Sequence, residues 1–145
     1  MTVELEIINE GFQPNPSYAH PGDAGLDLRS DDSAIVRSGE VQPVDTGLRI
    51  AVPNGYVGLI HPRSGLSSRG IGVANSPGTI DSGYRGPLKV LVHNFSEEDF
   101  RIQPGDRIAQ LVIVPIPTVK IVEVRKFTEE ETVRGTGGFG SSGAN

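Results

Sequence analysis

Asp81 is the acidic side chain best placed in the sequence to activate a water molecule. It lies in GTIDSGYRGPLKV, residues 78–90, between the apolar Ile80 and a short glycine-flanked turn at residues 83–86. Asp and Gly are also favoured in turns for backbone reasons alone, so this segment by itself fits equally well a β-hairpin whose Asp only caps the turn. Groups elsewhere in the chain favour the catalytic interpretation.

Two glycine-rich segments that each carry arginine supply groups for binding an anion. They are PRSGLSSRG, residues 62–70, and RGTGGFGSSG, residues 134–143. Arg forms planar bidentate contacts with phosphate, and successive backbone amides in glycine-rich turns also bind anions. A carboxylate that accompanies such groups suits phosphoryl chemistry, in which positioning and charge stabilisation of a polyphosphate supply most of the catalysis.

Two further polar residues are candidates for the same site. Asp27, in DAGLDLRS at residues 23–30, begins an apparent strand and could help to hold a divalent cation, although a turn Asp is an equally good interpretation of its spacing. Gln110 interrupts the apolar run RIAQLVIV, and its amide must find partners or cost about 1–3 kcal/mol. Gln110 therefore either ties the core together or faces a site.

Other kinds of site find little support. The sequence has no P-loop pattern, no GxSxG nucleophile elbow and no Cys, and His20, His61 and His93 lack metal-ligand spacing. Ser64 lies beside Arg63 but has no evident partner base, so covalent catalysis is the weaker hypothesis.

The length and the net charge of the chain limit the classes of protein to which it can belong. The 145 residues predict one domain, and the net charge of −5 argues against broad attraction to nucleic acid or to an anionic membrane. The start, MTVELEIINEG, does not resemble a signal peptide, and no apolar stretch approaches the ~18 residues that would span a membrane. The lack of Cys fits a reducing compartment, so we expect a cytoplasmic protein.

Short β-type runs separated by turn signals must position the candidate residues. In GLRIAV, for example, Leu48, Ile50 and Val52 alternate with Arg49 and Ala51, as in a half-buried strand. The pattern predicts an all-β sandwich or barrel, with a single helical turn at residues 64–69 as the helical candidate. Strands are expected at residues 3–8, 47–52, 56–61, 88–94, 107–116 and 119–124.

The last residues, 128–145, differ in composition from the rest. An EEE run is followed by glycine-rich sequence in which Val133 and Phe139 are the sizeable apolar side chains. Such a segment cannot keep itself folded, and a disordered tail or a linker is the plain interpretation. Arg134 and Phe139 argue against a passive spacer, because an arginine, glycine amides and an aromatic ring suit closure over a phosphate-bearing base.

Five segments in order resemble the motifs of the homotrimeric deoxyuridine triphosphatases (dUTPases): AGLDLRS, PRSGLSSRG, NSPGTIDSGYRG, GDRIAQL and RGTGGFGSSG. The match runs from residue 24 to residue 143. The resemblance implies a distorted jelly-roll β-barrel that assembles as a homotrimer. It also implies a catalytic domain at residues 1–127 and a flexible C-terminal arm at residues 128–145, which closes over the active site of a neighbouring subunit.

The same resemblance implies the reaction and its catalytic residues. The enzyme would hydrolyse dUTP to dUMP and pyrophosphate, which limits uracil incorporation into DNA and supplies dUMP for thymidylate synthesis. Asp81 would activate the water that attacks the α-phosphorus. Tyr84 would pack on the deoxyribose and leave no room for a 2′-hydroxyl. Asp27 would act through water on a Mg²⁺ ion bound to the triphosphate.

The resemblance assigns recognition of the base to one group of residues. Asn75 and the backbone of Thr79, Ile80 and Lys89 would read the edge of the uracil. Phe139 would stack on the uracil ring when the arm closes.

The phosphates would contact a different group. Arg63, Ser64 and Gly65 would bind them, with Gln110 hydrogen-bonding nearby. Arg134 would clamp the γ-phosphate.

One spacing departs from the family pattern, and two other functions compete with the first. The segment between Arg63 and Asn75 is one residue shorter than usual, so we expect the path of residues 69–74 to differ. The alternatives are a deoxycytidine triphosphate deaminase of the same fold and a non-catalytic nucleotide-binding jelly roll. The catalytic Glu of the deaminases has no evident counterpart beside residues 78–90. A non-catalytic protein would have little need for both Asp81 and a complete arm.

Overall fold

β-strands account for most of the regular structure in residues 1–144, the part of the chain that the computed structural model describes. Their sequences are rich in Val, Ile and Leu, which suit a pleated and half-buried surface. One helical turn, α1 (Ser64–Ser67), lies among them. The strands are β1 (Glu6–Asn9), β2 (Leu26–Arg29), β3 (Ala34–Val36), β4 (Val41–Asp45), β5 (Leu48–Ala51), β6 (Tyr56–His61), β7 (Ile71–Val73), β8 (Gly78–Ile80), β9 (Lys89–Asn94), β10 (Phe100–Ile102) and β11 (Arg107–Pro115).

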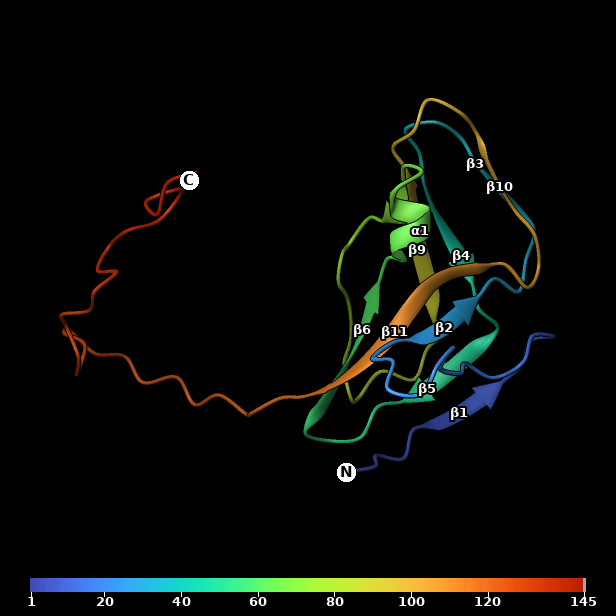
Figure 1. Cartoon of the computed structure of the whole chain (residues 1–145). Helices are drawn as coiled ribbons and strands as arrows, with labels where there is room; N and C mark the ends of the chain where they lie inside the picture. Colours follow the sequence, from blue (N-terminus) through green and yellow to red (C-terminus); the bar gives the residue numbers. More distant parts are fainter. Residues whose placement is uncertain (145) are drawn as a thin grey trace.

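Antiparallel pairing arranges these strands in two main sheets and two ribbons (Figure 1). The four-stranded sheet has the order β2–β11–β6–β8, and the three-stranded sheet has the order β4–β9–β7. The ribbons pair β1 with β5 and β3 with β10. The long β11 pairs with β2 on one side and β6 on the other, so β2 and β8 are the two edges of the four-stranded sheet.

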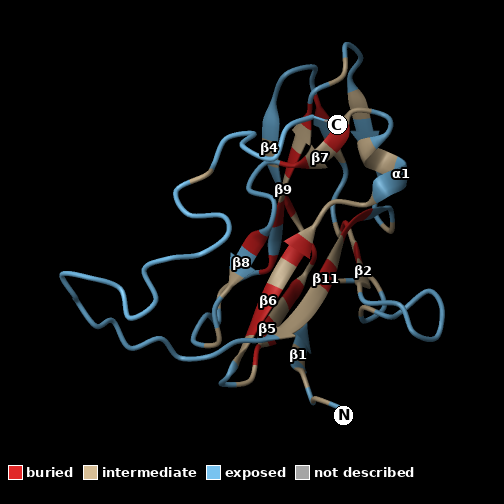
Figure 2. Cartoon of the chain, turned by 60° about the vertical axis from the view of Figure 1, so that its left-hand side comes forward, coloured by how far each residue is buried: buried red, intermediate tan, exposed pale blue. Residues whose placement is uncertain are grey.

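Buried residues alternate with more exposed ones along the strands, and the buried side chains form one core (Figure 2). In β9, Val90 and Val92 are buried, whereas Lys89 is exposed and Leu91 is half-buried. Full burial of a Val, Leu or Ile side chain stabilises the fold by about 1.5–3 kcal/mol, so this cluster holds the sheets together. Its buried members are Leu28, Val36, Val44, Leu48, Ile50, Val52, Ile60, Ile71, Val73, Leu88, Val90, Val92, Ile102, Ile108, Ala109 and Leu111.

The all-β prediction is confirmed, although the strands form separate sheets and ribbons rather than one continuous closed barrel. Strands occupy five of the six expected ranges, and the helical turn begins at Ser64 as expected. The strand expected at residues 119–124 is wrong. Val119 and Ile121 there are 71% and 84% exposed. An apolar run forms a strand only where another strand pairs with it and a surface covers it, and residues 1–144 supply neither to that segment.

The hairpin expected at residues 78–90 is also wrong as an account of strand pairing. β8 pairs with β6, whereas β9 lies in the other main sheet between β4 and β7. The segment between them, residues 81–88, therefore crosses from one sheet to the other. Glycine and proline in this segment suit a turn equally well in both arrangements, so the sequence did not distinguish them.

After Pro115 the chain leaves the body of the molecule (Figure 1). Residues 116–144 contain turns and bends but no strand or helix. The division into residues 1–127 and an arm at 128–145 stays a prediction, and Asn145 lies outside the described residues. No helix in residues 1–144 has the length and apolar character needed to cross a membrane.

Candidate functional site

The first pocket surrounds Asp81 and has a volume of about 480 Å³. We call it the Asp81 pocket. It lies where the chain passes from the edge strand β8 to β9. Its lining residues are Asn75, Thr79, Ile80, Asp81, Tyr84, Pro87, Lys89 and Leu91.

Local hydrogen bonds hold the turn that carries Asp81 and Tyr84. The Tyr84 N–H donates to the Asp81 carbonyl oxygen at 3.1 Å. Arg85 Nη1 donates to the carbonyl oxygens of Ser82 and Tyr84 at 2.7 and 2.9 Å. The Tyr84 hydroxyl donates to the Pro87 carbonyl oxygen at 2.8 Å. Asp81 and Tyr84 are therefore positioned by one closed turn that follows β8.

The Asp81 carboxylate itself has no partner among residues 1–144. It forms none of the ion pairs in this part of the chain, and its side-chain oxygens accept none of the hydrogen bonds there. Asp81 is exposed and lines the pocket, and a carboxylate without a partner can accept a proton from a water molecule that lies within hydrogen-bond reach. This geometry suits a general base better than a turn cap.

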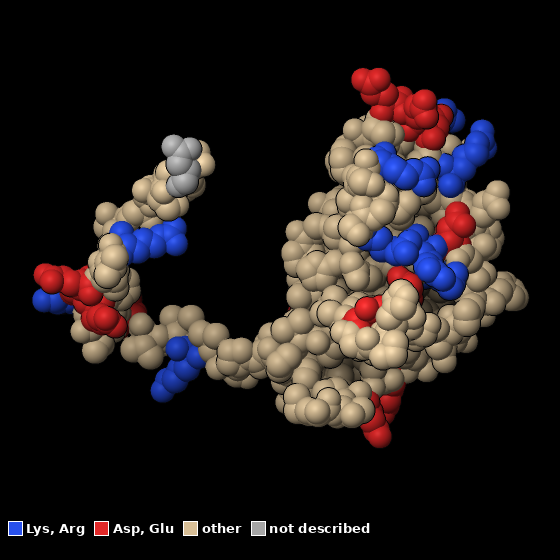
Figure 3. All heavy atoms as spheres, viewed as in Figure 1, with Lys and Arg blue, Asp and Glu red and all other residues tan. Residues whose placement is uncertain are grey.

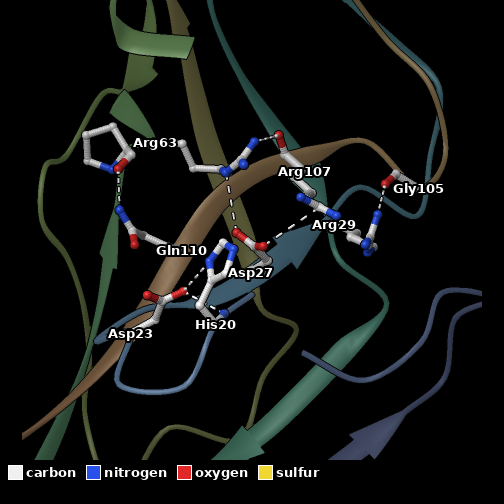
Figure 4. Close-up of polar contacts among 9 residues, drawn as sticks. His20, Asp23, Asp27, Arg29, Arg63, Gly105, Arg107 and Gln110 are labelled. Atoms are coloured by element: carbon white, nitrogen blue, oxygen red, sulfur yellow. Dashed lines mark hydrogen bonds and ion pairs between the residues drawn. The ribbon is translucent and has the colours of Figure 1, made fainter. Parts of the chain in front are cut away.

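The second pocket, which we call the Asp27 pocket, has a volume of about 320 Å³ and brings carboxylates and an arginine together. Asp27 lies on β2 and its side chain is 17% exposed. Its Oδ1 lies 3.3 Å from Arg63 Nε, and its Oδ2 lies 3.7 Å from Arg107 Nε (Figure 4). The lining residues are Ala19, Asp23, Ala24, Gly25, Asp27, Arg63, Ser64, Gly65 and Gln110.

Gln110 faces this pocket instead of tying the apolar core together. In β11 it lies opposite Asp27 of β2 and His61 of β6, and its Nε2 donates to the Pro62 carbonyl oxygen at 2.9 Å. A Cβ atom at position 25 would collide with Gln110 Oε1, so Gly25 leaves the space that this amide occupies. Gln110 therefore fixes the carbonyl just before Arg63 and lines the pocket at the same time.

Sequence reasoning missed several residues of the two pockets. Arg107 pairs with Asp27, and its carbonyl oxygen accepts a hydrogen bond from Arg63 Nη1 at 3.4 Å. Asp23 lines the Asp27 pocket, and its Oδ2 lies 3.4 Å from His20 Nδ1 (Figure 4). Arg107 stands within the GDRIAQL segment and Asp23 within DAGLDLRS, so both stood beside residues already selected, but no spacing rule singles them out.

The predicted residues divide between the pockets and the C-terminal tail. Asn75, Thr79, Ile80, Asp81, Tyr84 and Lys89 line the Asp81 pocket, and Asp27, Arg63, Ser64, Gly65 and Gln110 line the Asp27 pocket. No described residue lines both. Arg134 and Phe139 line neither: Arg134 Nε donates to the Gly137 carbonyl oxygen at 2.9 Å, and the Phe139 side chain is fully exposed.

The two pockets lie at opposite edges of the four-stranded sheet. β2, which carries Asp27, is three strand spacings from β8, which ends one residue before Asp81. Three spacings amount to roughly 14 Å across the sheet. Ile80 pairs with Gly58, three residues along β6 from the His61 that lies level with Asp27, which adds about 10 Å along the strands. Within one chain, the free carboxylate and the arginine pocket are far apart.

Charges of both signs are spread over the surface that carries the Asp27 pocket. On the face drawn in Figure 3, Lys and Arg side chains lie in several clusters with Asp and Glu side chains beside them. The ion pairs of Asp27 with Arg63 and Arg107 are an example of this arrangement. An anion that binds here meets local arginines rather than a continuous basic surface.

The loop that leads from the Arg63 segment to β7 is short. α1 ends at Ser67 and β7 begins at Ile71, with Gly70 between them at a φ of +83°. A Cβ atom at position 70 would lie 2.8 Å from Ser96 Cβ, and this φ is unfavourable for other residues. Gly70 thus permits the short path from the Arg63 segment to β7.

Known enzymes of one family are similar to this chain over nearly its whole length. A family model described as dUTPase matches residues 13–143. The chain is 50% identical over 151 residues to the deoxyuridine 5'-triphosphate nucleotidohydrolase of Mycobacterium leprae (strain Br4923), with 100% of this chain and 98% of the relative covered. It is 47% identical over 145 residues to the enzyme of the same name from Wolbachia pipientis subsp. Culex pipiens (strain wPip), with 97% and 95% covered.

Solved structures that are similar to this chain are also dUTPases. A mutant dUTPase of Staphylococcus bacteriophage 80alpha with dUpNHpp matches with a TM-score of 0.90 and 32% identity, over 98% of this chain and 99% of the phage chain. A mutant dUTPase of phage phi11 of S. aureus, which coordinates a structural Mg(II) ion, matches with a TM-score of 0.81 and 28% identity, over 88% and 100%. The sheets described above therefore correspond to the jelly-roll fold, and the chain belongs to the dUTPase family.

Proposed function

We propose that this enzyme hydrolyses dUTP to dUMP and pyrophosphate, with Asp81 as the general base. The observation that carries this assignment is the Asp81 carboxylate, which is unpaired within residues 1–144 and belongs to a residue that lines a pocket large enough for a nucleoside. Asp81 accepts a proton from water as the water attacks the α-phosphorus. The P–O bond to the β-phosphate breaks, and pyrophosphate leaves. General-base catalysis of this kind contributes about 10²–10⁴-fold to the rate.

Two unpaired strand edges suit recognition of the uracil. β8 pairs with β6 on one side only, so the other edge of Thr79 and Ile80 faces away from that sheet. β7 pairs with β9 at residues 92–94, and the Ala74 N–H donates to the Leu91 carbonyl oxygen. The start of β9, at Lys89, therefore has no partner strand on that side within residues 1–144. Backbone N–H and C=O groups on such edges can bond the donor and acceptor groups of a base. Asn75 lines the same pocket and adds a side-chain amide.

The remaining pocket residues suit binding of the sugar and of the triphosphate. Tyr84 lines the Asp81 pocket and is placed to pack on the deoxyribose. Arg63, the Ser64 hydroxyl and the backbone at Gly65 bind phosphate, with Gln110 beside them. These groups contribute positioning and charge stabilisation, which account for most catalysis in phosphoryl transfer.

A magnesium ion fits this donor set if its inner ligands come from the triphosphate and water. Asp27 lines the pocket, but its two oxygens already face Arg63 and Arg107. Residues 1–144 contain no cluster of three His, Asp or Glu side chains that could hold a metal. Mg²⁺ in nucleotide sites commonly keeps several waters and takes few protein ligands. Bound Mg²⁺ would supply charge neutralisation on the phosphates, and Asp27 would contact its water ligands.

We infer a homotrimer in which each active site combines groups from different chains. Asp81 and Arg63 serve one triphosphate, yet within a chain their pockets lie at opposite sheet edges. A neighbouring copy that brings its Asp27 pocket against the Asp81 pocket would complete the site. The apolar side chains after Pro115 also require a cover, because Val119, Ile121, Val122 and Phe127 are each at least 68% exposed.

The arm at residues 128–145 completes the site in the proposed trimer. From Thr128 onward the chain is long enough to extend about 60 Å, at ~3.3 Å for each residue. Arg134 would contact the γ-phosphate, and Phe139 would stack on the uracil of a neighbouring subunit. A cytoplasmic location, and the lack of nucleic-acid and membrane partners, stay predictions from the sequence.

Pyrophosphate and ammonia release, measured side by side with dUTP and dCTP, tests the proposed reaction. We expect pyrophosphate from dUTP and no ammonia from either nucleotide. Ammonia from dCTP would support the deaminase instead. Tight binding of dUTP without any product would support a non-catalytic protein.

A further inference from the structure

The end of the Tyr84 side chain fills the space where a side chain at position 86 would lie. A Cβ atom at this position would lie 2.5 Å from the Tyr84 hydroxyl oxygen, 2.7 Å from Tyr84 Cζ and 2.9 Å from Tyr84 Cε2. These separations are well below van der Waals contact, so the Tyr84 ring and a side chain at position 86 cannot share this space. The tip of the Tyr84 ring packs directly on the Gly86 backbone.

The backbone conformation at position 86 does not require a glycine. Gly86 is not among the glycines of residues 1–144 that have a positive φ, so an alanine could adopt its backbone angles. All three nearest atoms belong to one side chain. An alanine at position 86 would therefore displace the Tyr84 ring and leave the turn's backbone in place.

We propose that Gly86 is a specificity-determining residue, which acts by seating the Tyr84 ring against the sugar position. Two contacts then hold the ring: the backbone of Gly86 beneath it, and the Pro87 carbonyl oxygen, which accepts the hydroxyl hydrogen bond at 2.8 Å. Tyr84 is 42% exposed, so these two contacts hold a ring that is partly open to solvent. This inference rests on the proposed function, in which Tyr84 excludes the 2′-hydroxyl of a ribonucleotide.

The same turn supplies a matched control at Gly83. A Cβ atom there would meet nothing within 4 Å, and Gly83 also lacks a positive φ. Gly83→Ala and Gly86→Ala make the same chemical change on either side of Tyr84. They differ in whether the new methyl group meets the ring.

The test compares kcat/KM for dUTP and for UTP in the wild type, Gly83→Ala and Gly86→Ala. We expect Gly86→Ala to lower the dUTP-to-UTP ratio by about tenfold, a size typical of steric discrimination in a pocket. Gly83→Ala should leave the ratio within about twofold of the wild type. An unchanged ratio in Gly86→Ala, or an equal fall in both variants, would overturn the proposal.

A double-mutant cycle with Tyr84→Ala separates a seat for Tyr84 from a general structural role of Gly86. Without the ring there is nothing to displace, so Gly86→Ala should change the ratio no further in the Tyr84→Ala background. A further fall there would show that Gly86 acts by another route. If Gly86→Ala alone does not fold, the double variant with Tyr84→Ala tests the seat, because removing the ring removes the atoms that the new methyl group would meet. Recovery of folding in the double variant would support the proposal, and failure of the double variant to fold, where Tyr84→Ala alone folds, would overturn it.

The failures of the two proposals are distinguishable. If Tyr84→Ala leaves the dUTP-to-UTP ratio unchanged, Tyr84 is not the sugar gate, and both the gate and its seat are withdrawn. If Tyr84→Ala lowers the ratio and Gly86→Ala does not, the gate stands and only the seat is withdrawn.

Discussion

The two pockets hold their carboxylates in opposite ways. The Asp27 side chain is 17% exposed and lies 3.3 and 3.7 Å from two guanidinium groups, whereas Asp81 lines an open pocket and has no partner among residues 1–144. A paired carboxylate orients its partners, and its own electron pairs are engaged. An unpaired one is free to accept a proton. This contrast supports the proposal that Asp27 positions other groups and that Asp81 takes part in the chemistry.

Exchange of each carboxylate for its amide tests this contrast, and Asp81→Asn should give the larger effect. The amide keeps the size of the side chain but cannot act as a base, so we expect kcat to fall by about 10²–10⁴-fold while nucleotide binding persists. Single-turnover hydrolysis of dUTP and calorimetric binding of a non-hydrolysable analogue would measure the two quantities. The neighbouring Ser82→Ala is the control and should stay within about twofold of the wild type. Near-normal turnover by Asp81→Asn would remove Asp81 from the chemistry.

The separation of the pockets is tested by mixing inactive chains. Asp81→Asn chains and chains truncated after Thr132 should each be nearly inactive alone, because one lacks the base and the other lacks Arg134 and Phe139. Refolded together in equal amounts, about a quarter of the sites should combine an intact Asp81 with an intact arm, if these come from different subunits of a closed ring. Recovery of dUTP hydrolysis to about a quarter of the wild-type level is therefore expected.

Mixed assembly must be established in the same experiment. Native mass spectrometry of the refolded sample distinguishes trimers by their content of full-length and truncated chains. Mixed trimers without recovered activity would mean that each arm serves the Asp81 of its own chain. Absence of any trimer would instead contradict the assembly itself.

Asp27→Asn should give a smaller loss of a different kind. The amide no longer attracts Arg63 and Arg107, so both guanidinium groups lose their common anchor. We expect kcat/KM to fall by about 10–100-fold, as for residues that orient functional groups indirectly. The free energy of unfolding should also fall, by about 1–3 kcal/mol, because two guanidinium groups lose a partner that is largely shielded from water. Asp81→Asn breaks no such contact and should change it by less than about 0.5 kcal/mol.

Much of the arrangement follows from sequence because local chemistry determines it. Gln110 illustrates this: an amide inside an apolar strand had to face either a core partner or a site, and it lines the Asp27 pocket. The alternation in GLRIAV likewise fixed which residues of β5 are buried. Such signals are contained within a few residues, so no knowledge of the rest of the fold is needed.

The features that sequence reasoning missed depend on partners distant in the chain. Residues 78–90 read as a hairpin, but β8 and β9 pair with different strands, and turn residues do not reveal that choice. Residues 119–124 have a strand pattern, but no other strand in the described part of the chain pairs with them. Arg107 became significant only when β11 lay against β2, which brought its guanidinium group to Asp27.

Substitutions at two glycines separate packing from charge in the Asp27 pocket. Gly25 and Gly65 both line that pocket, and neither has a positive φ. A Cβ atom at position 25 would collide with Gln110 Oε1, whereas one at position 65 would meet nothing within 4 Å. Gly25→Ala must therefore push the Gln110 side chain from its bond to the Pro62 carbonyl oxygen, and we expect it to lower the free energy of unfolding by about 1–3 kcal/mol. Gly65→Ala, within α1, should be neutral or stabilise the protein by up to about 1 kcal/mol. Denaturant unfolding at a fixed chain concentration measures both free energies. Equal stability of the two variants would mean that the position of Gln110 does not depend on the absence of a side chain at position 25.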